Sequence, residues 1–171
     1  VGVWLGWVAF QSFGYAGFHR LASRTEAGGT IAFHYDTEDQ LVAVQNEAGE
    51  QYCFTLDPIG RVISETGFDG RTRHYSRDRA GRVTTVRKPS GLTSMLAYDP
   101  LGRIVGVEHS DGSKEAYHYR QDGALLQATN DATTVCFERD PLGRVLREWQ
   151  GNEWVSSDYA PTGDRTHVAS S

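Results

Sequence analysis

Acidic side chains that recur at a fixed spacing are the first residues in this sequence that could do chemistry. Asp99 stands in the stretch YDPLGRIVGV, and related stretches begin at Leu56, Arg77 and Arg139. A carboxylate of this kind could act as a general acid or base, and two of them could flank a glycosidic bond. The sequence alone does not place two carboxylates across a cleft. Their regular spacing therefore needs a structural explanation before a catalytic role is assigned.

The residues around Asp99 match the preferences of a type I β-turn position by position. Asp at the first position accepts backbone N–H groups, Pro100 at the second has its φ already set, and Gly102 at the fourth tolerates the conformation that leaves the turn. We therefore predict that Asp99 forms a turn and has no catalytic role. The same structural role is predicted for the equivalent residues of the other copies and the arginines that follow them, namely Asp36, Asp57, Pro58, Gly60, Arg61, Asp78, Gly81, Arg82, Arg103, Asp140, Pro141, Gly143 and Arg144.

These copies form a regular repeat. The aspartates at 36, 57, 78 and 99 are spaced by 21 residues, and the pattern continues through Arg120, Asp140 and Ala160. Before each turn apolar and polar residues alternate, as in Phe33-His34-Tyr35, and this period of two predicts strands. Pairs such as Asp69-Gly70 predict a second hairpin turn. Seven repeats of 20–21 residues therefore predict an all-β fold of about fourteen antiparallel strands, arranged as a curled or spiral sheet of β-hairpins.

Composition narrows the function classes. The 17 basic and 22 acidic residues give a net charge of −5, which lacks the basic footprint of a nucleic-acid-binding protein. Cys53 and Cys136 form no CxxC motif, and the six histidines show no metal-ligand spacing. The sequence has no P-loop, GxGxxG motif or nucleophile elbow. We therefore expect no metal, no cofactor and no nucleic-acid partner.

The first 19 residues differ from the rest because they contain no Lys, Arg, Asp or Glu. Their length approaches that of a membrane span, but glycines, Gln11 and Ser12 interrupt them and no basic residue precedes them. Packing against the rest of the protein, or plugging it, is favoured over membrane contact by residues 1–19. The composition changes near Gly28-Gly29, which predicts a linker over 20–29. The predicted organisation is an apolar aromatic segment and linker in residues 1–27, followed by a repeat array in residues 28–171.

The stretch from Tyr98 to Ile104 resembles the YD repeat of the Rhs (rearrangement hotspot) family, and this resemblance extends over residues 31–168. It implies a β-sheet that spirals into a hollow shell. In Rhs proteins and the related insecticidal toxin complexes, such a shell encloses a C-terminal toxin, and many bacterial examples are delivered by type VI secretion. Rhs cores commonly end in an autoproteolytic segment with Leu after Asp-Pro-x-Gly, whereas here Arg103 and its equivalents follow, so we assign no protease residues. Further departures are Asp39-Gln40 for Gly-Arg, and Arg77 and Arg139 for Tyr.

The resemblance implies a non-catalytic section of a shell wall that serves bacterial competition or attack on a host. Its partners would be the remaining shell segments and an enclosed toxin, with secretion-system components or surface glycans as further partners. Such a protein would be made in the bacterial cytoplasm and then secreted or delivered to a competitor or host cell.

Two other hypotheses stay open. A carbohydrate-binding or adhesive surface could use Tyr98 and Tyr119, because aromatic faces stack on pyranose rings and Arg supplies hydrogen-bond donors. An enzyme has the least support, because nothing in the sequence assembles a site. We expect the recurring arginines to lie beside the turn carboxylates or neighbouring carbonyls, where exposed ion pairs contribute about 0–1 kcal/mol each.

Overall fold

The computed structural model describes residues 11–17, 19–26 and 28–171. All regular elements in these residues are strands, and none of the described segments is a helix long and apolar enough to cross a membrane. The strands are β1 (Ser12–Ala16), β2 (Arg20–Glu26), β3 (Gly29–Tyr35), β4 (Leu41–Gln45), β5 (Gln51–Leu56), β6 (Val62–Thr66), β7 (Thr72–Arg77), β8 (Val83–Arg87), β9 (Thr93–Tyr98), β10 (Ile104–His109), β11 (Lys114–Tyr119), β12 (Leu125–Asn130), β13 (Thr134–Arg139), β14 (Val145–Gln150), β15 (Glu153–Tyr159) and β16 (Arg165–Ser170).

The strands follow one another in the sheet in chain order, from β1 to β16. The predicted all-β fold of antiparallel hairpins is thereby confirmed. The fourteen expected strands correspond to β3–β16, and β1 and β2 are additional. Strand β2 occupies most of residues 20–29, so the prediction of a linker there is wrong: Thr25 and Thr30 are strand partners with hydroxyls 2.9 Å apart.

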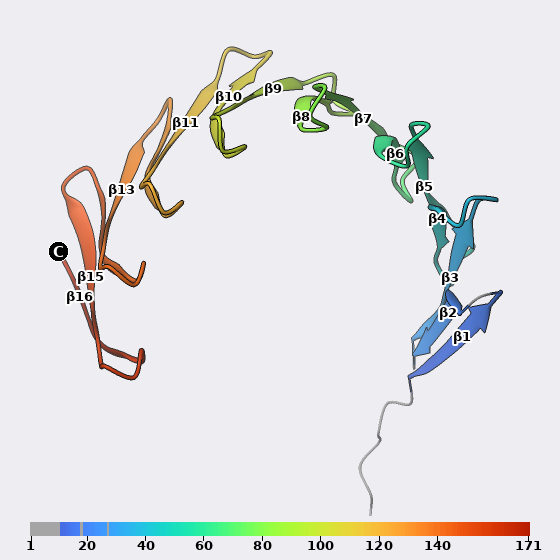
Figure 1. The fold of residues 1–171 in the computed structure, drawn as a ribbon, viewed down its shortest axis with the longest axis horizontal. Coiled ribbons are helices and arrows are strands. Elements are labelled where there is room, and N and C mark those ends of the chain that lie inside the picture. Colours follow the sequence, from blue (N-terminus) through green and yellow to red (C-terminus); the bar gives the residue numbers. More distant parts are fainter. Residues whose placement is uncertain (1–10, 18, 27) are drawn as a thin grey trace, which may run out of the picture. The chain divides into compact units, whose positions relative to one another are not determined.

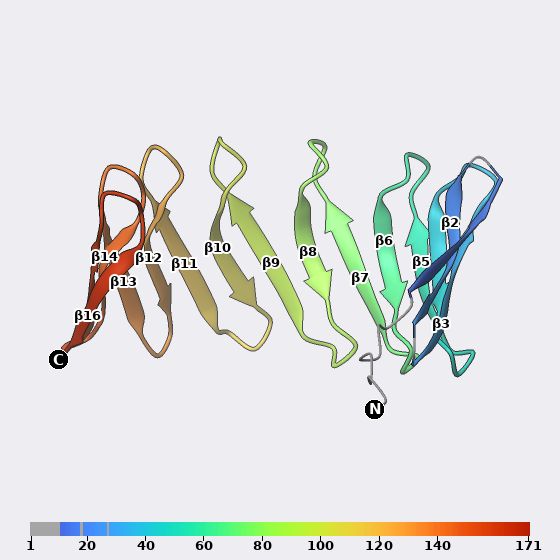
Figure 2. The same cartoon turned by 90° about the horizontal axis from the view of Figure 1, so that it is seen from below.

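The chain divides into two compact units, which are described separately. One comprises the chain through Ser76 together with Arg87–Ser90, and the other comprises Arg77–Val86 together with Gly91–Ser171. Within each unit, consecutive hairpins lie side by side and their turns alternate between two opposite edges of the sheet (Figures 1 and 2). The division of the chain into residues 1–27 and 28–171 stays a prediction. Most of the apolar segment proposed for residues 1–19 lies outside the described residues.

The strand period explains which side chains share a face. Along β9, Leu96 and Tyr98 point to one face while Met95 and Ala97 point to the other. After the turn, a β-bulge shifts the register between Ile104 and Gly106. The hairpin at Asp57 has the same shift, because Leu56 pairs with Val62 and Thr55 with Ser64, which leaves Ile63 as the extra residue after the turn.

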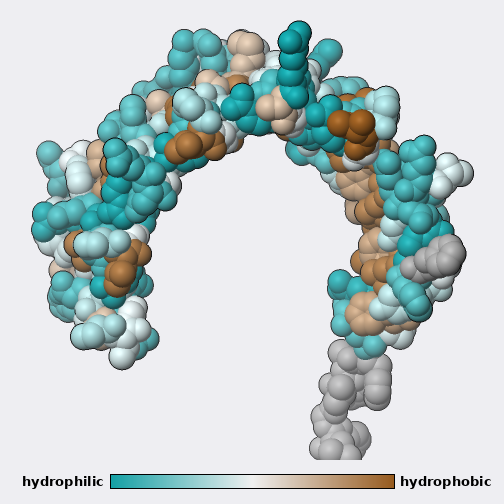
Figure 3. Space-filling model, in the orientation of Figure 1, coloured by the Kyte–Doolittle hydropathy of each residue, from teal (hydrophilic) through white to brown (hydrophobic). Residues whose placement is uncertain are grey.

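Burial within the units is shallow because each unit is a single layer of strands. Among the described residues the only apolar side chain in the buried class is Ala43, which is 7% exposed, whereas Met95 is 53% and Leu142 is 78% exposed. Apolar side chains reach the surface among polar ones in both units (Figure 3). A layer without a second layer on it buries little apolar area. Strand pairing and contacts between neighbouring hairpins must therefore supply much of the stability.

Candidate functional site

The turn at Asp99 is closed by its own side chain. The Asp99 Oδ1 atom accepts hydrogen bonds from the backbone N–H groups of Leu101 and Arg103, both at 2.9 Å. The Gly102 N–H donates to the Asp99 carbonyl oxygen at 3.0 Å, and Gly102 has φ = +81°. This is a three-residue hairpin loop made of a type I turn followed by a left-handed residue, which is why glycine stands fourth.

The other copies repeat this geometry. At Asp57 the Oδ1 atom accepts from the N–H groups of Ile59 at 3.1 Å and Arg61 at 2.9 Å, and at Asp140 it accepts from Leu142 and Arg144, both at 2.9 Å. Asp36 and Asp78 accept in the same way. The structure thus places Pro58, Pro100 and Pro141 second in the loops, and Gly60, Gly81, Gly102 and Gly143 at positive φ. In the first repeat Asp39 takes the glycine position with φ = +64°.

The arginine after each glycine binds the turn carboxylate. The Arg103 Nε atom donates to Asp99 Oδ2 at 2.6 Å, and Arg61, Arg82 and Arg144 do the same to their own turn aspartates at 2.6 to 2.8 Å. The pKa of Asp99 lies below its ordinary value because the backbone N–H and the guanidinium of Arg103 both stabilise the charged carboxylate. A carboxylate that is held ionised by its own turn is poorly suited to general acid chemistry.

The same guanidinium reaches the following hairpin. Arg103 lies over the ring of Tyr119 at 4.9 Å, and its Nη1 atom donates to the Arg120 carbonyl oxygen at 2.9 Å. The Tyr119 hydroxyl in turn donates to the carbonyl oxygen of Ile104, the residue after Arg103, at 2.8 Å. We call this combination of cation–π contact and tyrosine hydrogen bond the Arg–Tyr clasp. It joins successive hairpins at the edge where the Asp-x-x-Gly turns lie.

The Arg–Tyr clasp recurs wherever the two residues are present in successive hairpins of one unit. Arg82 lies 4.9 Å from the Tyr98 ring, and Arg144 lies 4.9 Å from the Tyr159 ring. The Tyr98 hydroxyl donates to the carbonyl oxygen of Val83, the residue after Arg82, at 2.6 Å. The Tyr159 hydroxyl donates to the carbonyl oxygen of Val145, the residue after Arg144, at 3.0 Å. The expected arginine ladder therefore contacts both the turn carboxylates and the neighbouring carbonyls.

Arginine in the tyrosine position keeps the hydrogen bond to the preceding hairpin. Arg139 Nε donates to the Leu125 carbonyl oxygen at 2.9 Å, the carbonyl that a tyrosine hydroxyl would reach. Its Nη1 atom also donates to the carbonyl of Gly143 in its own turn at 2.8 Å. Arg77 makes the equivalent bond to Gly81 at 3.0 Å. At Arg139 the departure from the YD pattern thus keeps the hydrogen bond to the preceding hairpin.

The hairpin of β1 and β2 contains a further clasp that sequence reasoning missed. The Arg20 guanidinium lies 5.4 Å from the Tyr35 ring, and the Tyr35 hydroxyl donates to the Leu21 carbonyl oxygen at 3.0 Å. The loop before Arg20 has no Asp-Pro-x-Gly sequence, and it turns through positive φ at Gly17 and His19. The available signal was Arg20-Leu21, an arginine followed by an aliphatic residue as in Arg82-Val83.

One polar cluster has the residue types of a hydrolase triad. Ser94 Oγ lies 2.8 Å from His109 Nδ1, and His109 Nε2 lies 3.3 Å from Glu115 Oε1, which places β9, β10 and β11 in one network. Ser94, however, is only 5% exposed. A nucleophilic hydroxyl must reach a substrate carbonyl, which this burial prevents. The cluster thus links three neighbouring strands through side-chain hydrogen bonds.

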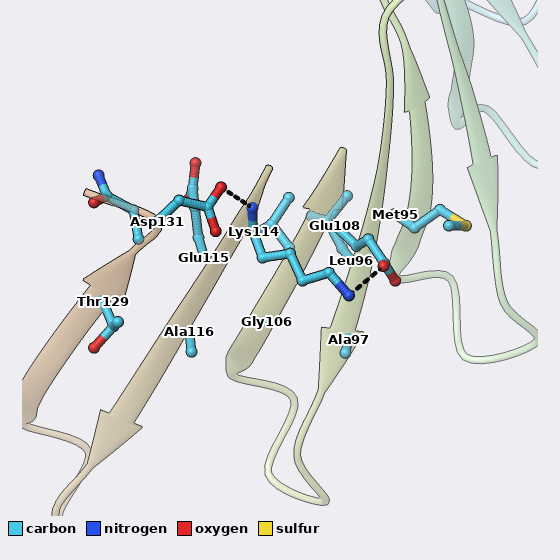
Figure 4. Close-up of a pocket in the computed structure, with 12 residues that line it drawn as sticks. Met95, Leu96, Ala97, Gly106, Glu108, Lys114, Glu115, Ala116, Thr129 and Asp131 are labelled. Carbon is cyan, nitrogen blue, oxygen red and sulfur yellow. Dashed lines mark hydrogen bonds and ion pairs between the residues drawn. The ribbon is translucent and has the colours of Figure 1, made fainter. Parts of the chain in front are cut away.

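A recess of about 460 Å³ lies on one face of β9–β12 (Figure 4). Its floor is formed by small side chains, including Ala97 and Ala116, with Gly106 between them. Lys114 Nζ pairs with Glu108 at 2.6 Å, and the Lys114 backbone N–H donates to Asp131 Oδ2 at 3.0 Å. The Lys114 ammonium is thus paired with the Glu108 carboxylate, and the Asp131 carboxylate accepts from the backbone, so these groups form no reactive constellation. Across the described residues, no group of three or more His, Cys, Asp or Glu side chains is placed to hold a metal ion.

Comparison with known proteins agrees with the turn geometry. Residues 57–93, which contain the turns at Asp57 and Asp78, match the family model described as RHS Repeat. Residues 57–93 therefore carry the RHS repeat. A comparison with curated protein sequences gives no match.

The chain is also similar in fold to solved structures. A Tc holotoxin pore of Photorhabdus luminescens, with a TccC3 variant, aligns with a TM-score of 0.70 at 14% identity, over 84% of this chain and 9% of that one. A TcdB2-TccC3 structure without its hypervariable C-terminal region aligns with a TM-score of 0.70 at 14% identity, over 83% of this chain and 9% of that one. At this identity the likeness is one of fold, and this chain spans less than a tenth of the length of either protein.

Proposed function

We propose that this chain is a section of the wall of an Rhs-type β-shell that encloses a C-terminal toxin or effector domain. The observation that carries the proposal is that the hairpin fold aligns with Tc toxin structures that contain TccC3, while residues 57–93 match the RHS Repeat family model. The partners would be the remaining shell segments and the enclosed toxin. The protein would be made in a bacterium and secreted or delivered to a competitor or host cell, with type VI secretion as one route.

The mechanism would be exclusion rather than catalysis. A wall has to stay continuous, and the Arg–Tyr clasp supports continuity because each clasp ties one hairpin to the next at their turn edge. The strand edges of each hairpin are used in pairing with the neighbouring hairpins, so few backbone groups are left to pair with a cargo chain. A single layer with half-exposed faces suits a partition between two compartments better than a domain with its own deep core.

Limited proteolysis of the full-length parent protein, followed by mass spectrometry, tests this proposal. The parent is expressed with everything that its gene encodes after Ser171. We expect the downstream segment to stay intact until the repeats are cut. Rapid digestion of that segment while the repeats survive would overturn encapsulation.

The alternative of a carbohydrate surface built on Tyr98 and Tyr119 is not favoured. A guanidinium covers one face of each ring at 4.9 Å, and each hydroxyl already donates to a backbone carbonyl oxygen. These tyrosines are therefore committed to holding the hairpins together.

A further inference from the structure

Two tryptophan side chains lie opposite each other beside the loop that joins β14 and β15. Trp149 and Trp154 are strand partners, and Gly151 and Asn152 form the loop just beyond them. Gly151 has φ = +60°, the left-handed conformation that such a short hairpin loop requires. Because directly opposite strand partners keep their side chains on the same face of a sheet, the hairpin holds the two indole rings next to each other.

The pair lines a recess of about 300 Å³, which we call the Trp recess. Trp149 is 36% exposed and Trp154 is half-buried, so both rings are partly open to solvent. The Arg147 guanidinium lies 5.4 Å from the centroid of the Trp154 ring. Among the described residues, no cation lies over the Trp149 ring in this way. The Trp recess thus combines an aromatic ring that already binds a cation with a second ring that is open to one.

Two carboxylates belong to the walls of the Trp recess. Glu138 lies on β13 opposite Arg147, and Glu153 is the first residue of β15. In the part of the chain that the structure describes, neither carboxylate makes a side-chain hydrogen bond or an ion pair. The two carboxylates and the one guanidinium give the lining residues a net charge of −1. This charge, together with the aromatic rings, favours a cation as the ligand.

We propose that the Trp recess binds a trimethylammonium group, either of free choline or of a choline-containing lipid headgroup. The methyl groups would lie on the Trp149 ring, whose quadrupole attracts the positive charge, and Glu138 and Glu153 would face the cation. A primary ammonium can also pair with a carboxylate, but it is strongly hydrated and gains little from rings that are half open to solvent. A trimethylammonium group has no N–H donor that the indole rings would leave unsatisfied.

This inference goes beyond a role in a shell wall and does not depend on it. A tryptophan pair across two strands also stabilises its own hairpin, and this would be its whole role if no ligand bound. Hairpin stabilisation alone does not require two carboxylates without partners beside the rings. The two roles differ in their consequences, because only a binding site discriminates between cations that differ in their methyl groups.

Saturation-transfer NMR on the full chain tests the proposal with three small probes. Choline carries the trimethylammonium group, and ethanolamine has the same backbone without the methyl groups. The third probe is the neutral carbon analogue of choline, in which a tert-butyl group replaces the trimethylammonium group. We expect transfer to the methyl protons of choline. Binding of the other two probes should be weaker by about tenfold or more, since one lacks the apolar surface and the other lacks the charge.

Variants of the chain separate a binding role from a folding role. Trp149→Ala should weaken choline binding about tenfold, and Trp149→Phe should retain part of the affinity because it keeps an aromatic face. Glu153→Gln should weaken binding while leaving the circular dichroism spectrum and the unfolding midpoint unchanged. The matched controls lie in the other unit: Phe68→Ala removes a ring that is 42% exposed, and Glu50→Gln removes an exposed carboxylate beside a hairpin loop. Both controls should leave choline binding unchanged.

Vesicles distinguish the two sources of the trimethylammonium group. Co-sedimentation with phosphatidylcholine vesicles and not with phosphatidylglycerol vesicles, lost in Glu153→Gln, would assign a lipid headgroup. Binding of choline without binding to phosphatidylcholine vesicles would assign a soluble ligand.

Several results would overturn the proposal. These are no transfer to choline, binding of either other probe as strong as that of choline, or choline binding that is unchanged in Trp149→Ala or in Glu153→Gln. None of these results bears on the shell wall, which the proteolysis of the parent protein tests separately.

Discussion

The Tyr98 hydroxyl donates a hydrogen bond of 2.6 Å to the Val83 carbonyl oxygen in the preceding hairpin. Tyr98 thus connects two hairpins, through this bond and through the Arg82 guanidinium, which lies 4.9 Å from its ring. The repeat pattern of the sequence shows only that a tyrosine recurs at this position. In a single-layer sheet, such connections replace part of the stabilisation that a second layer would give.

Replacing Tyr98 by Phe tests the hydrogen bond in this clasp. Tyr98→Phe keeps the ring under Arg82 and leaves the Val83 carbonyl without its donor, so we expect a loss of about 1 kcal/mol in the free energy of unfolding. Tyr98→Ala should cost more, because it removes the ring as well. Urea unfolding followed by circular dichroism measures both, with exposed Tyr15→Phe as the control. Equal stability of Tyr98→Phe and the wild type would show that the bond contributes nothing.

Arg139 allows the tyrosine position to be tested in the opposite direction. Arg139→Tyr should keep the hydrogen bond to the Leu125 carbonyl oxygen and lose the bond to Gly143, so the stability should change by less than about 1 kcal/mol. Arg139→Ala loses both bonds and should be clearly less stable than Arg139→Tyr. Thermal unfolding of the three proteins compares them. If the Tyr and Ala variants were equally destabilised, the two side chains would not be equivalent at this position.

The turns could be predicted from sequence because their chemistry lies within five consecutive residues. Asp99, Pro100 and Gly102 each satisfy a local requirement of one loop, and the constant spacing of the copies follows from the length of a hairpin. The all-β fold followed from the same pattern. The hairpin of β1 and β2 was missed because its loop, with positive φ at Gly17 and His19, lacks that local signature.

Contacts between hairpins could not be predicted, because they depend on register. Arg103 and Tyr119 meet because the β-bulge after the turn at Asp99 and the pairing of β10 with β11 fix how these strands align. A slip by one residue would move a side chain to the other face. The network of Ser94, His109 and Glu115 draws on three strands for the same reason.

The fourth residue of the turn should tolerate little besides glycine. Gly102 has φ = +81°, and although a Cβ added here would meet no atom within 4 Å, a left-handed conformation costs an alanine about 1–2 kcal/mol. Gly106 is a matched control in the next strand, where a Cβ would meet the Glu115 carbonyl oxygen at an ordinary 3.6 Å. Gly106→Ala should be neutral or stabilising by up to about 1 kcal/mol. Chemical unfolding measures the stability of both variants. A Gly102→Ala variant as stable as the wild type would contradict the turn assignment.

Tyr117 should titrate at unusually high pH. Its hydrogen bond to Glu115, together with partial burial and the charge of that carboxylate, raises the pKa of Tyr117 to about 12. Glu115→Gln removes the charge, so the pKa of Tyr117 should fall towards its ordinary value of 10.0. Phenolate absorbance during an alkaline titration measures this, and Tyr117→Phe identifies the band. An unchanged titration in Glu115→Gln would mean that the carboxylate is not the cause.

Acid should weaken the turn edge of the sheet. The guanidinium of Arg120 and the backbone N–H of Ala124 lower the pKa of Asp122 from 3.8 to about 2. Because the folded state favours the ionised carboxylate, its contribution to stability is present above pH 3.8 and is lost as the pH falls through about 2. The pKa values of Asp57, Asp78, Asp99 and Asp140 are also lowered from 3.8, so the contributions of these carboxylates to stability should likewise be lost in acid, below pH 3.8.

Asp122→Asn isolates one of these carboxylates. The variant should be less stable than the wild type near neutral pH, and the difference should shrink as the pH approaches about 2, because the wild-type carboxylate is then becoming protonated. Urea unfolding at a series of pH values measures the difference, and Glu50→Gln, an exposed acid at another loop, serves as the control. A difference that stays constant down to the lowest pH would show that the ion pair with Arg120 does not stabilise the fold.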